Sequence, residues 1–167
     1  MRTTIRALGV AAIAAGALRI VDSFTTQSFS PATLAWLYLV TDVLLLLGIA
    51  GIYWSRRARL AVAGTSGTVI FILGIVLIRI AAFGGLGSSG YQLGAAVAVL
   101  GLALFAFDDL LRRSGHDAAA SLWLATFVFG VAGALGLMPI AMTMIAGVTF
   151  GAGFVVSGLE VARGQSI

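Results

Sequence analysis

Six long apolar stretches alternate with short, more polar connections along the chain. They cover about 4–23, 32–54, 60–83, 91–111, 118–138 and 140–162 of the 167 residues. A hydrocarbon core about 30 Å thick is crossed by roughly 20 apolar residues in a helix, and each stretch has about this length. The pattern therefore predicts an all-α fold, a six-transmembrane-helix bundle of three consecutive hairpins that forms one integral-membrane domain over residues 1–167.

Capping and turn residues support these boundaries. Ser30 followed by Pro31 is typical of a helix N-cap with proline at the first helical position. The run 114–117 ends one helix and offers Asp117 as the cap of the next. Met138 and Pro139 leave so little chain that the last two helices must form a very tight hairpin, whereas GGLGSSG at 84–90 is expected to be a flexible loop.

The first apolar stretch resembles a secretory signal only in part. It follows two arginines, but it ends with Arg19 and Asp22 instead of a small-residue cleavage site. We therefore expect this segment to be retained as the first membrane span.

The composition agrees with a membrane protein and excludes several chemistries. Of the residues, 60% are hydrophobic and 10% are charged, whereas soluble domains keep about a quarter charged. The chain contains no lysine and no cysteine, and His116 is its only histidine. Schiff-base, disulfide and thiolate chemistry are therefore excluded, and zinc or haem sites lack their usual ligands. We expect no cofactor, no metal site and no enzymatic activity.

The arginines indicate an orientation in the membrane. Eight of them fall at one end of the predicted helices: Arg2, Arg6, Arg56, Arg57, Arg59, Arg112, Arg113 and Arg163. The connections at the opposite end contain no cation, so the positive-inside rule places both termini in the cytoplasm of a bacterial inner membrane. The net charge of +4 is then a topology signal, and no nucleic-acid partner is expected.

Four charged residues of the first three helices lie in the outer half of the predicted bilayer: Arg19, Asp22, Asp42 and Arg79. The arginines can extend toward the interface, but Asp42 is too short and should be neutral or paired with Arg19 or Arg79. These residues form a structural ion network, hold an anionic head group or substrate, or, through Asp42 alone, relay protons.

The acidic residues near the cytoplasmic end have nearby arginines. Asp108 and Asp109 precede Arg112 and Arg113 by four residues, and Glu160 precedes Arg163 by three, which predicts interfacial salt bridges. A divalent-metal site at the aspartate pair is the alternative, although no third acidic ligand is evident.

Small residues recur at positions where helices could approach closely. Gly147 and Gly151 form a GxxxG pair that Gly158 continues, and such faces pack helix backbones against one another in lipid. The pair could serve packing within the chain or a homodimer. Gly16, Gly74 and Gly133 occupy similar depths in the first, third and fifth helices, which suggests a helix-packing role in a repeat of three hairpins.

The last hairpin resembles the repeating hairpins of the HdeD-type family of small bacterial inner-membrane proteins. The likeness is carried by Pro139 and by the glycines described above at 147, 151 and 158, with a fainter likeness at Gly16 and Pro31. Arg79 and the glycine-rich loop after it depart from that pattern. The resemblance implies a membrane role associated with acid stress, without a defined catalytic site.

Together these features predict a non-enzymatic, multi-pass inner-membrane protein that is structural or stress-related, or that binds a lipid or small anion near the outer leaflet. Its expected partners are membrane lipid and a second copy of the chain. The alternative is a small dimeric transporter or channel. Six hydroxyl residues could line its path: Thr41, Thr65, Ser66, Thr68, Thr126 and Thr143.

Overall fold

The structure of the protein, a computed structural model, describes residues 2–25, 30–84, 87–112 and 118–164. This part of the chain contains helices and no strand, which confirms the all-α prediction. The six helices are α1 (Arg2–Thr25), α2 (Pro31–Arg56), α3 (Val62–Ala82), α4 (Gly87–Arg112), α5 (Ala118–Ala134) and α6 (Pro139–Ala162).

Five of the helices are long and apolar enough to cross a membrane, and α5 is apolar but shorter. This supports the prediction of a multi-pass membrane protein. With 17 residues, α5 is about 25 Å long at 1.5 Å per residue, less than the thickness of a typical hydrocarbon core. The predicted fifth span, 118–138, was therefore too long.

The early end of α5 has a local cause. Gly136 adopts a left-handed backbone with φ of 83°. The Leu137 N–H donates to the Ala132 carbonyl and the Gly136 N–H to the Gly133 carbonyl, both at 3.0 Å. This is the Schellman arrangement, which satisfies the last carbonyl groups of a helix. Residues 135–138 then form the tight connection that the sequence predicted.

The other helix boundaries confirm one prediction and correct another. The Ser30 hydroxyl accepts a hydrogen bond from the Thr33 N–H at 3.2 Å, and Pro31 is the first residue of α2, as predicted. Residues 87–90 belong to α4, so the loop predicted at 84–90 is shorter. Packing explains this start, because Gly90 and Gly94 share a buried face and Gly94 lies against Ile78 of α3. The predicted cap Asp117 lies outside the described residues.

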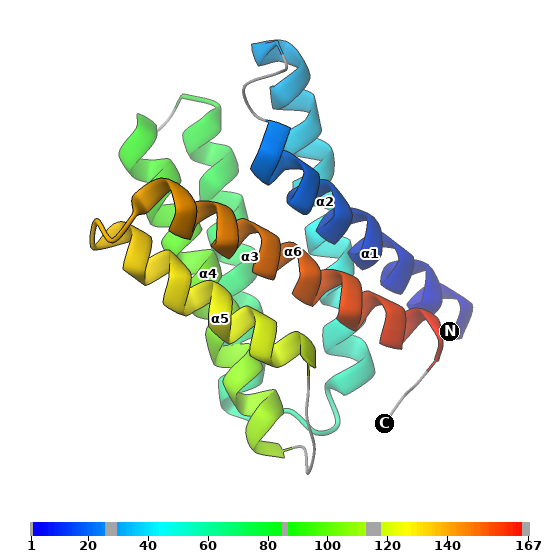
Figure 1. The fold of residues 1–167 in the computed structure, drawn as a ribbon. Helices are drawn as coiled ribbons and strands as arrows, with labels where there is room; N and C mark the ends of the chain where they lie inside the picture. The colour runs from blue at the N-terminus through cyan, green and yellow to red at the C-terminus, as the bar shows by residue number, and fades with distance from the viewer. Residues whose placement is uncertain (1, 26–29, 85–86, 113–117, 165–167) are drawn as a thin grey trace.

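The helices are packed in two crossing groups (Figure 1). α5, α6 and α1 lie side by side and cross α3 and α4 at a wide angle. Going around the bundle, neighbours follow the order α2, α1, α6, α5, α4 and α3, while α2 and α3 contact each other only sparsely. Both termini lie at one end of the bundle, which we call the terminal end. We call the other end, where α1 ends and α2 begins, the turn end.

Glycines allow the closest helix contacts. A Cβ atom on Gly151 would lie 2.5 Å from the Gly16 carbonyl oxygen of α1, and one on Gly158 would lie 2.7 Å from the Gly9 carbonyl oxygen. The face formed by Gly147, Gly151 and Gly158 is therefore covered by α1 of the same chain. Gly74 lies against Ala98 of α4 in the same way, whereas a Cβ on Gly133 would lie 3.3 Å from the Met142 side chain and need only a small adjustment.

An aromatic cluster fills the middle of the bundle and joins four helices. Its five side chains come from α3, α4, α5 and α6, with ring centroids of contacting pairs 5.1–6.2 Å apart. The members are Phe71, Phe105, Trp123, Phe150 and Phe154. All five are buried, so the cluster separates the two halves of the interior.

Candidate ligand-binding site

A cavity of about 920 Å³ lies between the aromatic cluster and the turn end, with residues of all six helices in its wall. A second hollow of about 460 Å³ adjoins it near the end of α1 and the start of α6. The two share lining residues and are therefore continuous. The shared residues are Arg19, Tyr38, Tyr91, Thr143 and Gly147. The larger cavity alone has the size of a small-molecule site, for which about 300–1,000 Å³ is usual.

Asp42 and Arg79 form an ion pair in the wall of this cavity. The Arg79 Nε atom lies 2.5 Å from Asp42 Oδ2, with side chains 19% and 12% exposed. The contact is a close charge pair and is not aligned as a hydrogen bond. It connects α2 and α3 where these helices otherwise contact sparsely. The prediction that Asp42 pairs with an arginine is confirmed, and Arg79 is the partner.

Arg19 and Asp22 form the second pair, within α1. The Arg19 Nη1 atom donates to Asp22 Oδ2 at 2.8 Å, as expected for residues one helical turn apart. The Asp22 side chain is only 5% exposed and that of Arg19 is 35% exposed. Asp22 is therefore packed against protein. In both pairs the aspartate is the more buried partner, and each guanidinium borders the cavity beside its carboxylate.

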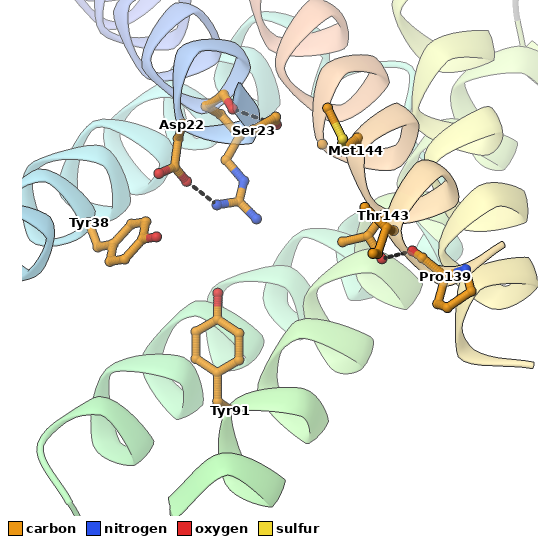
Figure 2. Close-up of a pocket in the computed structure, with 10 residues that line it drawn as sticks. Asp22, Ser23, Tyr38, Tyr91, Pro139, Thr143 and Met144 are labelled. Carbon is orange, nitrogen blue, oxygen red and sulfur yellow. Dashed lines mark hydrogen bonds and ion pairs between the residues drawn. The ribbon is translucent and has the colours of Figure 1, made fainter. Parts of the chain in front are cut away.

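Tyrosine and threonine hydroxyls complete the polar part of the cavity. Figure 2 shows the Tyr38 and Tyr91 hydroxyls pointing into the space beside Asp22, with Thr143 of α6 across from them. Thr41 is buried in the cavity wall, and its hydroxyl has no hydrogen-bond partner in the described residues. Tyr38 and Tyr91 were missed from the sequence, because tyrosines near helix ends are common in any membrane protein.

The predicted hydroxyl path is confirmed only in part. Thr41, Thr126 and Thr143 line the cavity, where the latter two also donate to helix carbonyls. Thr65 and Ser66 are exposed on α3 away from the cavity, and the Thr68 hydroxyl donates to the Gly64 carbonyl at 3.0 Å. Hydroxyl groups in helices often bond the preceding turn in this way.

The remaining wall of the cavity is apolar. Side chains of α3, α4 and α5 supply most of it: Ile75, Ile78, Ala95, Ala98, Val99, Phe127 and Val131. Phe150 of the aromatic cluster closes the cavity toward the terminal end. The site is therefore amphipathic, with charged and hydroxyl groups toward the turn end and apolar side chains below them.

A separate cluster of charges lies at the terminal end. Arg56 of α2 contacts Asp109 of α4 at 2.6 Å and Glu160 of α6 at 2.7 Å, and it donates to the Ser157 hydroxyl at 2.9 Å. Arg56 and Asp109 are almost fully buried. Glu160, which was predicted to pair with Arg163, therefore pairs with Arg56, and Arg56 is buried instead of lying at the interface.

The spacing of apolar residues along α2 could have indicated that Arg56 is buried. Arg56 follows Leu45, Ile49 and Ile52 at spacings of four and three residues, which places it on the buried face of α2. The predicted pair of Asp108 with Arg112 is confirmed at 3.1 Å, and Asp108 also accepts the Ala61 N–H at 2.7 Å. Arg113 and His116 lie outside the described residues.

The described residues do not bring three metal-ligating side chains together. No protein-family model, no curated protein and no solved structure matches this chain. The resemblance of the last hairpin to the HdeD-type family therefore stays a prediction. Function has to be argued from the cavity and its side chains.

Proposed function

We propose that this protein is a non-enzymatic, multi-pass membrane protein that binds a ligand with an anionic group in the cavity near the turn end. One observation carries the proposal. Arg19 and Arg79 both line the same cavity of about 920 Å³, where Asp42 lies beside Arg79, and Asp22 lies beside Arg19 in the adjoining hollow.

The chemistry of guanidinium groups supports an anionic ligand. Each guanidinium has five N–H donors in a planar fork that matches carboxylate and phosphate oxygens. In the described residues, Arg19 uses Nη1 for Asp22 and Arg79 directs Nε toward Asp42, so further N–H groups remain for a ligand. Hydrogen bonds between charged groups are about twice as strong as neutral ones, and the apolar wall around this site strengthens them further.

The aspartates also stabilise the two arginines when no ligand is bound. An arginine left without a partner in a membrane interior would be costly, and each aspartate removes much of this cost. The Asp42–Arg79 pair also links α2 to α3, whereas the Arg19–Asp22 pair lies within α1. The structural and the binding interpretation of these residues are then two aspects of one arrangement.

We place the protein in a bacterial inner membrane with both termini in the cytoplasm. The reason is that eight of the ten arginines, those other than Arg19 and Arg79, belong by their positions in the sequence to the helix ends on the side of the termini. The cavity would then open toward the outer leaflet. Transport, the alternative function, is favoured by a cavity that reaches Asp42 from one end. It would also require the aromatic cluster to separate, so binding remains our proposal.

The experiment measures binding of octyl phosphate, a soluble anion with a short apolar tail, to the purified protein by calorimetry. Octanol serves as the uncharged comparison. We expect the phosphate to bind and the alcohol to bind much more weakly. Replacing each pair by neutral residues, Arg19→Gln with Asp22→Asn or Arg79→Gln with Asp42→Asn, should weaken binding by about tenfold or more, because charged hydrogen bonds contribute about 1.5–3 kcal/mol each.

Arg112→Gln is the matched control. It removes an arginine of the same kind that also pairs with an aspartate, at the other end of the bundle, and should leave binding unchanged. Neutralising both members of a pair avoids leaving a buried charge, and thermal unfolding checks that each variant is folded. Equal binding of octanol and octyl phosphate, or no binding by the wild type, would contradict the proposal.

A further inference from the structure

One side of the cavity wall is open between the turn-end halves of α4 and α5. Leu93 of α4 and Val131 of α5 line the cavity, yet they are 57% and 42% exposed. Gly130 lies between them on the cavity side of α5, and a Cβ atom placed there would meet no other protein atom within 4 Å. We call the opening formed by Leu93, Ala96, Gly130, Val131 and Ala134 the α4–α5 portal.

The wall is closed on the α2–α3 side and deeper between α4 and α5. On the α2–α3 side, the large apolar residues Leu45, Ile75 and Ile78 are buried, and the Asp42–Arg79 pair closes the contact. Lower down between α4 and α5, the Phe105 and Trp123 rings pack with centroids 5.8 Å apart. The axes of α5 and α4 cross at a wide angle, so the two helices diverge away from their crossing (Figure 1).

The portal faces lipid, because the adjacent hairpin tip is itself apolar. Leu135, Leu137, Met138 and Ile140 are all exposed at the connection from α5 to α6. The backbone N–H groups of Leu135, Gly136 and Leu137 donate within the turn, so this connection does not need water. Since α5 is shorter than a typical hydrocarbon core is thick, its tip need not reach the surface of the bilayer.

Along α4, polar and apolar residues of the cavity wall occur in the same order as the head group and acyl chain of a lipid. Ser89 and Gln92 line the cavity on the turn-end side of α4, and the portal residues one turn deeper are apolar. A lipid in the adjacent leaflet also has its polar head group toward the surface and its acyl chain below it. Thr41 adds a buried hydroxyl to the cavity wall that has no hydrogen-bond partner among the residues the structure describes and is available to a ligand oxygen.

We infer that the ligand is an anionic membrane lipid, which moves in sideways through the α4–α5 portal, with its head group at Arg19 and Arg79 and an acyl chain along the apolar wall. This inference rests on the proposed anion-binding function and adds the chemical class of the ligand and its route. The cavity supplies both halves of such a molecule with matching surroundings, whereas a small soluble anion would leave the apolar part empty.

Gly130→Phe tests the route, because the new ring would fill the portal without displacing protein atoms. The probe is a photoreactive long-chain fatty acid added to the protein in lipid nanodiscs, with crosslinking measured by mass spectrometry. We expect crosslinking inside the cavity to fall by about tenfold or more, while octyl phosphate still binds within about threefold of the wild type. Val128→Phe, on the lipid-facing side of the same helix, is the matched control and should change neither.

Leu93→Trp, on the opposite side of the portal, is a second variant in case Gly130→Phe fails to fold. If octyl phosphate binds but neither variant lowers crosslinking, the portal is wrong and the anion site stands. If both probes are lost to the same extent, the variants have blocked the site instead of a lipid route, and the inference is overturned. If octyl phosphate does not bind the wild type, the proposed function itself fails.

Discussion

Each buried arginine of the cavity and of the terminal end has an acidic partner. Arg19, Arg56 and Arg79 pair with Asp22, Asp109 and Asp42, respectively. The pairing of Asp42 could be predicted, because a short side chain deep in a membrane has no route to water. The Arg56 cluster was missed, because an arginine at the end of an apolar stretch also fits an interfacial position and only its phase on the helix distinguishes the two.

Arg56→Met should destabilise the protein strongly. The substitution keeps most of the side-chain volume but removes the cation that contacts both Asp109 and Glu160, and removing one member of a buried pair costs about 3–5 kcal/mol. Thermal unfolding in detergent, followed by tryptophan fluorescence, measures the loss. Adding Asp109→Leu to the variant should restore part of the stability.

The neighbouring arginine provides the control for this prediction. Arg57 is exposed and its guanidinium lies 4.0 Å from the centre of the Trp54 ring. Arg57→Met should therefore cost less than about 1 kcal/mol. Equal unfolding temperatures for the two variants would contradict the assigned role of the Arg56 cluster.

At the scale of the helices, the sequence predicted how many helices the chain forms and, to within a few residues, where most of them begin and end. A run of about 20 apolar residues has few alternatives to a helix, and Ser30 with Pro31 marks a start without ambiguity. The two misjudged boundaries involve glycine. Gly136 ends α5 early through its left-handed backbone, and Gly87 to Gly90 join α4 because packing against α3 outweighs their poor helix propensity.

Two glycines should respond in opposite ways to alanine. Gly151→Ala would push a methyl group against the Gly16 carbonyl oxygen and separate α1 from α6, with a cost of about 1–3 kcal/mol. Gly130→Ala meets open space and should be neutral or stabilise α5 by up to about 1 kcal/mol. Thermal unfolding of both variants in the same detergent tests the pair, and a loss of stability at Gly130 would contradict the open portal.

At the scale of the whole molecule, the neighbours of each helix could not be predicted. In a membrane protein both the lipid-facing and the buried faces are apolar, so hydrophobic periodicity carries little information about packing. The glycine pattern indicated that helices approach closely but did not say which ones. The amphipathic cavity also depends on this arrangement, because its charged residues come from α1, α2 and α3 and most of its apolar wall comes from α3, α4 and α5.

Fusions to reporters test the orientation. Green fluorescent protein joined to Ile167 should fluoresce and alkaline phosphatase joined there should be inactive, because both termini are expected in the cytoplasm. Phosphatase joined after Phe83, at the end of α3, should be active on the opposite side. An active phosphatase at the carboxy terminus would reverse the proposed orientation and assign the cavity to the inner leaflet.

The aromatic cluster has a consequence for what the molecule could report to a cell. Its five packed rings lie between the cavity and the terminal end, so a bound molecule exchanges on the turn-end side of the bundle. Occupancy would then follow the concentration of ligand in a single leaflet, independent of the other. A protein with this shape is suited to sampling one face of an asymmetric membrane.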